Sequence, residues 1–248
     1  VIYSMDLMER LDQELYHSKL PEALEAKDEG LLRYALRKYK DHPDIGHGKK
    51  IWEIATSSNI DAVRKDAIIS YCLQDDAEIE YALALLDSDN DLEREASIIG
   101  LIFRGDVESI VFAGQALLGL VNDKDRENHF LALKIIEELG IKNFYRPVLR
   151  FLQSEEPDLC LQAIRASGEV RNERFIPVLL DLIMEPSFRI EAQNALSRIG
   201  EEAIGPIIEK LNGEGSIQVK ASLIKCLGRN GGPEAIDCLI GMIDYPHL

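Results

Sequence analysis

The sequence has few of the residues that build membrane spans, disulfide frameworks and aromatic surfaces. Its 248 residues include one tryptophan and four cysteines, and aromatic side chains make up 6% of the total. No stretch reaches the roughly 18 uninterrupted apolar residues that a membrane helix needs, so we predict no direct membrane insertion. The cysteines form no C-x-x-C pair and lie on apolar helical faces, which predicts reduced core residues rather than metal ligands or disulfides. They are Cys72, Cys160, Cys226 and Cys238.

A secretory signal is also missing, and the chain begins with Val1 rather than Met. We therefore expect an excised or processed fragment, located in the cytoplasm or forming the cytoplasmic part of a membrane-attached protein. Reduced cysteines fit that location, because cytoplasmic thiols are kept unpaired.

Basic residues are scarce, with 28 Lys and Arg against 44 Asp and Glu, which gives a formal net charge of −16. So acidic a surface repels phosphate backbones, and nucleic acid is therefore not the expected partner. The charge favours solubility, and it would also attract a basic protein; the composition leaves both interpretations open.

Motifs that carry catalysis or bind cofactors are missing as well. No G-x-x-x-x-G-K-[ST], H-E-x-x-H or G-x-S-x-G occurs, and the Gly-Gly of "GRNGGPEA" is typical of a turn between helices. His42 and His47 are close together in "DHPDIGH", but nothing in the sequence fixes the geometry of that loop for a metal. We predict no catalytic residue, no cofactor and no metal.

What the sequence does contain is a repeated amphipathic helix. In "SFRIEAQNALSRIG", apolar residues follow helical spacing and a glycine ends the segment, and the same pattern recurs along the chain at intervals of 29 to 36 residues. A small residue marks each copy and predicts a close crossing of two helices. These alanines are Ala67, Ala96, Ala132, Ala163, Ala192 and Ala221.

A second set of helices is expected between these copies, in segments such as "RPVLRFL", "IPVLLDLI" and "GPIIEKL". Pro147, Pro177 and Pro206 fall where a first helical turn accepts proline. A two-helix unit of about 30 residues cannot bury its apolar face alone and must stack on its neighbours. The predicted fold is all-α, a right-handed α-solenoid (α-α superhelix) of about six to eight helical hairpins.

The repeated helix resembles the second helix of HEAT repeats, which carries an Asp-x-x-Val-Arg-x-x-Ala-x-x-Ala-Leu pattern. Val63, Arg64 and Ala67 match its first part, and the segment from Phe188 to Gly200 matches nearly all of it. The short period is similar to the HEAT-like repeats of cyanobacterial bilin lyases and of many bacterial regulatory proteins. The resemblance implies a scaffold with Asp/Arg ladder contacts between repeats and a concave face formed by the second helices.

The resemblance divides the chain unevenly. Residues 58–248 form the predicted HEAT-like solenoid, which we expect to be one continuous domain. Residues 1–57 form a predicted N-terminal helical cap of degenerate repeats. The last hairpin lacks its second helix, so we expect the native solenoid or a fused domain to continue beyond Leu248.

Basic residues recur on the helices that would line the concave face, and they are the candidate partner-binding residues. An acidic peptide or helix would suit such a row; the alternative is that these side chains are solvated or pair with neighbouring acids. Arg64 and Arg189 are better explained as structural ladder residues. The candidate row is Lys134, Arg165, Arg198, Lys225 and Arg229.

Aromatic residues near the N-terminal cap are a second candidate. Trp52, Tyr34 and Tyr39 could anchor a partner, but core packing is the favoured interpretation.

The leading functional hypothesis is a non-enzymatic protein–protein interaction or scaffolding module. The resemblance to bacterial proteins suggests a cytoplasmic regulatory domain of a larger protein, such as a transporter resembling nucleotide translocases. The alternative is a bilin lyase-like HEAT-repeat enzyme. A DNA glycosylase on a HEAT-like scaffold fits least, because it needs a cationic concave surface.

Overall fold

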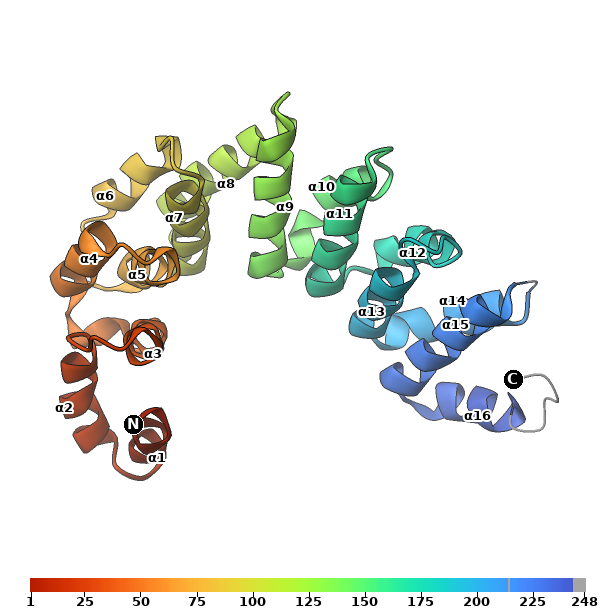
Figure 1. The fold of residues 1–248 in the computed structure, drawn as a ribbon, viewed down its shortest axis with the longest axis horizontal. Helices are drawn as coiled ribbons and strands as arrows, with labels where there is room; N and C mark the ends of the chain where they lie inside the picture. Colours follow the sequence, from red (N-terminus) through yellow and green to blue (C-terminus); the bar gives the residue numbers. More distant parts are fainter. Residues whose placement is uncertain (214, 243–248) are drawn as a thin grey trace. The chain divides into compact units, whose positions relative to one another are not determined.

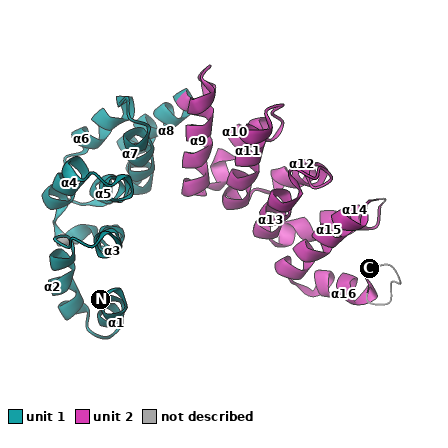
Figure 2. Cartoon of the chain, in the orientation of Figure 1, with its two compact units in different colours: residues 1–119 teal, residues 120–248 magenta. Residues whose placement is uncertain are grey.

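The protein is described here by a computed structural model that covers residues 1–213 and 215–242. The chain divides into two compact units, Val1–Gly119 and Leu120–Leu248 (Figure 2). Within the described ranges the secondary structure is helical and contains no β-strand. The predicted all-α architecture of stacked, HEAT-like helix pairs is confirmed in both units.

Unit 1 is built from helices that alternate between two layers (Figure 1). The odd-numbered helices α3, α5 and α7 pack on one another, and the even-numbered helices α2 and α4 lie against them. We call these the odd layer and the even layer. The helices are α1 (Ile2–Leu11), α2 (Gln13–Ala23), α3 (Glu29–Tyr39), α4 (Gly48–Ser57), α5 (Asp61–Leu73), α6 (Ile79–Ala84) and α7 (Asp91–Arg104), with 3-10 turns η1 (Pro43–Ile45) and η2 (Leu85–Asp87).

Helix α8 (Val107–Asn122) begins in unit 1 and ends in unit 2, and unit 2 repeats the two-layer arrangement. Its odd layer stacks in chain order, and α10, α12 and α14 each pack against the odd helix that follows them. The helices are α9 (Arg126–Leu139), α10 (Tyr145–Leu152), α11 (Pro157–Val170), α12 (Ile176–Leu182), α13 (Arg189–Ile199), α14 (Ile204–Leu211), α15 (Ile217–Asn230) and α16 (Pro233–Met242), with 3-10 turns η3 (Lys142–Phe144), η4 (Glu173–Phe175) and η5 (Glu201–Ala203).

The turns of unit 2 explain why the chain reverses at regular intervals. After α9, α11 and α13 comes a residue with positive φ, then a 3-10 turn, then a helix with proline in its first turn. Glycine suits the positive-φ position because it has no Cβ to clash, and Gly140 and Gly200 occupy it. Arg171 takes the same position after α11 with φ 51°. Pro147, Pro177 and Pro206 lie in first turns, as predicted.

Several helices begin at a polar side chain that accepts a backbone N–H. Asp28 accepts from Leu31 at 2.8 Å, Asn90 from Leu92 at 2.9 Å, and Asp125 from Glu127 at 3.1 Å. Such caps satisfy donors that a helix cannot pair internally, and each stabilises its helix by about 1 kcal/mol.

In five of the six copies, the alanine predicted to mark a close helix crossing is buried. Ala67, Ala96, Ala132, Ala163 and Ala192 are all fully buried. Between α11 and α13 the approach is so close that a Cβ on Gly168 would lie 3.2 Å from the Cα of Ala195.

The sixth copy was assigned to the wrong face. Ala221 is only half-buried and Ile217 is 67% exposed, whereas Val219, Leu223 and Cys226 form the buried face of α15. Both sets of residues have helical spacing, and packing selects the second. The crossing position of α15 is therefore Leu223.

Polar side chains of one repeat bind the carbonyls that end a helix of the preceding repeat. Arg104 donates to the carbonyls of Cys72 and Gln74 at 2.8 and 3.1 Å. Asn230 donates in the same way to Gly200 at 3.0 Å. A helix end leaves carbonyls unpaired and carries a partial negative charge, so these contacts tie successive repeats together.

The two arginines interpreted as structural both make contacts with neighbouring helices. Arg64 pairs with Glu93 on α7, an inter-repeat ion pair. Arg189 instead donates to the carbonyls of Ile183 and Met184, at 3.1 and 3.0 Å, and closes the end of α12.

The N-terminal region is helical, and the segment "MDLMERLDQELY" spans two helices, α1 and α2. They are separated at Asp12, whose carboxylate accepts the N–H of Leu15 at 3.0 Å and caps the start of α2. The division into a cap (1–57) and a solenoid (58–248) stays a prediction. The expected continuation past Leu248 concerns a chain end that lies outside the described residues.

Three of the four cysteines lie in the core, as predicted. Cys72, Cys160 and Cys226 are buried and Cys238 is half-buried, all as free thiols. No helix in the described part of the chain is long and apolar enough to cross a membrane.

Candidate protein-interaction site

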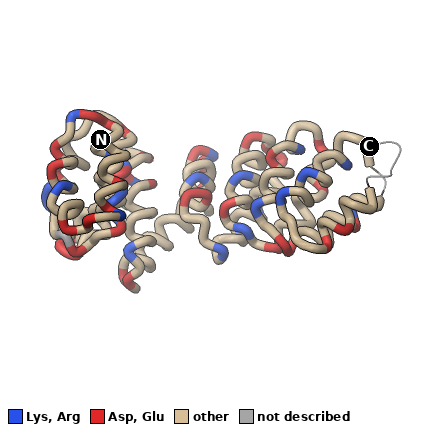
Figure 3. Tube along the Cα trace, turned by 90° about the horizontal axis from the view of Figure 1, so that it is seen from below, with Lys and Arg blue, Asp and Glu red and all other residues tan. Residues whose placement is uncertain are grey.

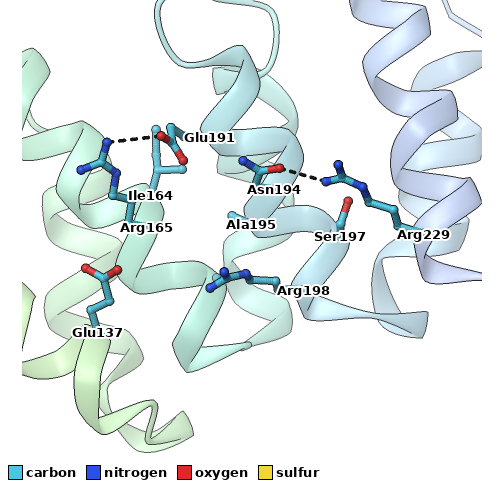
Figure 4. A pocket seen from close by; sticks show the side chains of 10 residues that line it. Glu137, Ile164, Arg165, Glu191, Asn194, Ala195, Ser197, Arg198 and Arg229 are labelled. Atoms are coloured by element: carbon cyan, nitrogen blue, oxygen red, sulfur yellow. Dashed lines mark hydrogen bonds and ion pairs between the residues drawn. The ribbon is translucent and has the colours of Figure 1, made fainter. Parts of the chain in front are cut away.

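The odd layer of unit 2 carries a hollow of about 530 Å³ that opens between successive helices (Figure 4). We call it the arginine hollow. It contains three arginines, one each from α11, α13 and α15. The lining residues are Glu137, Ile164, Arg165, Gly168, Glu191, Asn194, Ala195, Ser197, Arg198 and Arg229.

Two of the arginines are paired with carboxylates. Arg165 lies 3.3 Å from Glu191 on the next helix, and Arg198 pairs with Glu169 on the preceding one. Their side chains remain 46% and 53% exposed. Pairs as exposed as these are weak, typically below about 1 kcal/mol, so a competing carboxylate can exchange into them.

Arg229 differs from the other two because its partner is neutral. Its guanidinium donates to the amide oxygen of Asn194 at 2.9 Å (Figure 4), and within residues 1–213 and 215–242 it forms no ion pair. The positive charge of Arg229 is therefore not neutralised locally.

The repeat explains how these residues come together. Two positions on each odd helix are exposed or half-buried, and they lie two and six residues after a buried residue, which is Ala132, Ala163, Ala192 or Leu223. The two positions are one helical turn apart and so lie on the same face. The residues there are Lys134 and Glu138 on α9, Arg165 and Glu169 on α11, Asn194 and Arg198 on α13, and Lys225 and Arg229 on α15.

Charge consequently changes along the odd layer of unit 2. On α9 and α11 a cation is followed four residues later by a glutamate, so each pair is neutral. On α13 the pair carries one positive charge, and on α15 it carries two. Figure 3 shows the resulting mixture of basic and acidic positions along the chain. The positive end of this face is formed by α13 and α15.

The structure thus places three of the five predicted residues in one hollow. Arg165, Arg198 and Arg229 line it, whereas Lys134 and Lys225 do not. Lys225 is exposed one turn before Arg229 and extends the positive end. The five residues also occupy two repeat positions rather than one. Their role in binding stays a prediction.

Sequence reasoning missed the polar residues that hold the arginines. These residues are Glu191, Glu169 and Asn194, which contact Arg165, Arg198 and Arg229 from a neighbouring helix. The spacing of the cations gives no signal for them, because each contact joins two different helices.

The histidine loop shows no arrangement of ligands. His42 lies against His17, with ring centroids 4.9 Å apart, while His47 lies against Tyr39 at 5.5 Å. Among the residues that the structure describes, no three His, Cys, Asp or Glu side chains gather as they would around a metal ion.

The three aromatic residues have different environments. Tyr39 is buried, and burial raises the pKa of its hydroxyl. Tyr34 donates a hydrogen bond to Asp6 at 2.8 Å. Trp52 is half-buried, as Tyr34 is, and packs against two tyrosines.

Comparison with known proteins gives similarity of fold only. No known family profile matches the sequence, and no curated protein matches it. A chain from the complex of CpcE and CpcF of phycocyanin lyase from Nostoc sp. PCC7120 is similar over 91% of this chain and 93% of its own, with 16% identity and a TM-score of 0.47. A designed armadillo repeat protein, YIII(Dq)4CqI, is similar over 86% of this chain and 99% of its own, with 18% identity and a TM-score of 0.39. At these values neither similarity bears on what this chain binds.

Proposed function

We propose that the protein is an interaction module whose arginine hollow binds an acidic segment of a partner protein. The observation that carries the proposal is the convergence of Arg165, Arg198 and Arg229, from three consecutive repeats, in one hollow of an otherwise acidic chain. Guanidinium groups form bidentate hydrogen bonds with carboxylates, so three of them in a row suit a peptide with repeated Asp or Glu.

Binding would use the three arginines differently. Arg229 gains a carboxylate without losing an ion pair, because the Asn194 amide is its acceptor among the described residues. Arg165 and Arg198 exchange Glu191 and Glu169 for groups on the partner. Most of the affinity should therefore come from the α15 side of the hollow.

Interaction rather than catalysis also fits the lining of the hollow. A bilin lyase-like site needs apolar walls for a tetrapyrrole, and this lining is mainly charged and amide side chains with few apolar ones. A regulatory domain of a larger bacterial protein, for example of a nucleotide-translocase-like transporter, is one setting for such a module, and the sequence resemblance alone suggests it.

The test is fluorescence anisotropy with a labelled 12-residue peptide rich in Glu, using a Gln-for-Glu peptide as the neutral probe. We expect saturable binding of the Glu peptide, weakened about tenfold or more by the double variant Arg198→Glu with Arg229→Glu. The matched control is Lys27→Glu with Lys124→Glu, which makes the same charge change at exposed positions outside the hollow.

Equal loss of binding in both double variants would show that only net charge matters and would overturn the proposal. Added phycocyanobilin should leave its own absorption spectrum unchanged. A shifted spectrum that disappears in the Arg198/Arg229 variant would favour the enzyme hypothesis instead.

A further inference from the structure

A second recess lies in unit 1, between the even-layer helices α4 and α6 and above the end of α5. Its volume is about 320 Å³, and we call it the aromatic recess. Its lining combines three aromatic rings, three carboxylates and one amine. The residues are Lys49, Trp52, Glu53, Tyr71, Asp76, Glu78 and Tyr81.

The aromatic rings form a continuous stack with one open end. Trp52 lies between Tyr71, at a centroid distance of 4.8 Å, and Tyr81, at 5.4 Å with the two rings only 13° from parallel. Tyr71 is buried and Tyr81 is 46% exposed. If the cluster served only to fill the core, Tyr81 would be covered. Instead its ring is available to another group.

The backbone around the recess is fixed by the same residues. The Tyr71 hydroxyl accepts the N–H of Glu78 at 2.8 Å and donates to the Glu78 carbonyl at 3.0 Å. Asp76 accepts the N–H of Gly48, at the start of α4, at 3.1 and 3.2 Å. A Cβ on Gly48 would lie 2.6 Å from the Asp76 carboxylate, so glycine is required for this contact.

Charge in the recess is strongly negative. Glu53, Asp76 and Glu78 face one cation, Lys49, and in the described part of the chain Lys49 makes no ion pair. Interaction with the Glu78 carboxylate raises the pKa of the Tyr81 hydroxyl, in agreement with the presence of both side chains in the lining of the recess.

We propose that the aromatic recess binds a cationic side chain, Arg or Lys, from a basic partner segment. The cation would lie over the exposed ring of Tyr81, continuing the stack, with its charge facing Glu53 and Glu78. A cation on an aromatic face gains about 0.5–2 kcal/mol, depending on desolvation, and carboxylates beside it add to this. The ligand is opposite in charge to that of the arginine hollow, and the recess lies in the other unit, so the two proposals are independent.

The chain itself shows that it stabilises this kind of contact. Arg174 lies over the ring of Tyr145 at 4.4 Å, Arg126 over Phe130 at 4.8 Å, and Arg150 over Phe151 at 4.7 Å. In the aromatic recess the ring and the acids are present, but no arginine of the chain covers Tyr81 among the described residues. A partner has to supply it.

The experiment uses the intrinsic fluorescence of Trp52, which is the only tryptophan in the chain and lies in the recess. The full chain is titrated with the peptide Gly-Gly-Arg-Gly-Gly, its Lys counterpart, and a Gln counterpart as the uncharged probe. We expect a saturable change with the Arg peptide, a smaller or weaker one with the Lys peptide, and none with the Gln peptide.

Four variants then separate binding from general attraction to an acidic protein. Glu78→Gln should weaken Arg-peptide binding about threefold, and Lys49→Gln should strengthen it by a similar factor, because it removes a positive charge that repels the incoming cation. Asp89→Asn, an exposed loop position outside the recess, should leave it unchanged. Tyr81→Ala should remove the response while Trp52 remains as reporter.

The absence of a saturable Trp52 response to the Arg peptide would overturn the proposal. So would equal effects of Glu78→Gln and Asp89→Asn, or a Lys49→Gln variant that binds no better than the parent. If Tyr81→Ala fails to fold by circular dichroism, the Lys49→Gln result still decides, since it changes only an exposed side chain.

Discussion

At the scale of single residues, the arginine hollow depends on a buried glycine. Gly168 lets α11 approach α13, and its missing Cβ would meet both the Ala195 backbone and the Arg198 side chain, the latter at 3.3 Å. A larger residue here would push the two helices apart and displace Arg198. Packing and binding are therefore coupled at this position.

The first prediction compares this glycine with an open one. Gly168→Ala should destabilise unit 2 by about 1–3 kcal/mol through overpacking. Gly228→Ala on α15, where a Cβ would meet nothing within 4 Å, should stabilise it by about 0.5–1 kcal/mol because alanine favours helix. Urea unfolding followed by circular dichroism measures both, and equal signs would contradict the packing described here.

The second prediction concerns Arg171, the one non-glycine residue with positive φ within residues 1–213 and 215–242. It stands where other odd helices end in glycine, and a side chain in that conformation costs about 1 kcal/mol. Arg171→Gly should therefore raise the unfolding free energy by a similar amount. Arg171→Ala, which keeps the Cβ, is the control and should give no comparable gain.

The spacing of cations in the sequence selected Arg165, Arg198 and Arg229, which the structure brings to one hollow. Their role in binding stays a prediction. The spacing did not identify Asn194 or Glu191, because an arginine's partner depends on which side chains of the next helix lie opposite, and that offset follows from packing rather than from order in the chain.

At the scale of helices, some polar contacts between successive repeats bind helix ends. The third prediction tests this with Arg104, whose side chain is largely covered and binds two carbonyls at the end of α5 as well as Asp106. Arg104→Met keeps the apolar stem and loses the hydrogen bonds, so unit 1 should be destabilised by about 1–2 kcal/mol. Arg10→Met, at an exposed position on α1, makes the same chemical change and should have little effect.

Helix positions were predictable because glycine, proline and capping residues mark their ends. The buried face of α15 was not. Ile217, Ala221 and Ile224 form one apolar row, and Val219, Leu223 and Cys226 form another with identical spacing. Only contact with α13 and α14 distinguishes the buried row from the exposed one, and the sequence pattern does not reveal that contact.

At the scale of the whole molecule, each repeat contacts mainly its sequence neighbours, and stability is then close to a sum of local terms. The two units carry different reporters: Trp52 in unit 1, and the buried thiols of Cys160 and Cys226 in unit 2. The fourth prediction is that urea midpoints from Trp52 fluorescence and from labelling of these thiols differ. Coincident midpoints would show a single cooperative transition instead.

Alkaline pH should affect unit 1 more than unit 2. Burial raises the pKa of the Cys72 thiol to about 12 from 9.0, and those of Tyr16 and Tyr71 to about 12 from 10.0. A raised pKa means that the folded state holds the proton more tightly, so this stability is complete below the unfolded pKa and is lost as pH rises toward 12.

The fifth prediction follows from these shifts. The unfolding free energy reported by Trp52 should fall steeply between about pH 9 and 12. Tyr71→Phe removes one of the titrating groups and should make the fall shallower. A slope unchanged by Tyr71→Phe would rule out that hydroxyl as a contributor.

The division of each odd helix into a packed side and an open side has an evolutionary consequence. The crossing residues are buried and fix the packing of the helices, while the positions two and six places later are exposed or half-buried. Substitutions at those positions can therefore accumulate without loss of the fold. A lineage could change from one ligand to another by substituting a few surface residues in each repeat. Among homologues, we expect those columns to vary most between groups with different partners and least within a group.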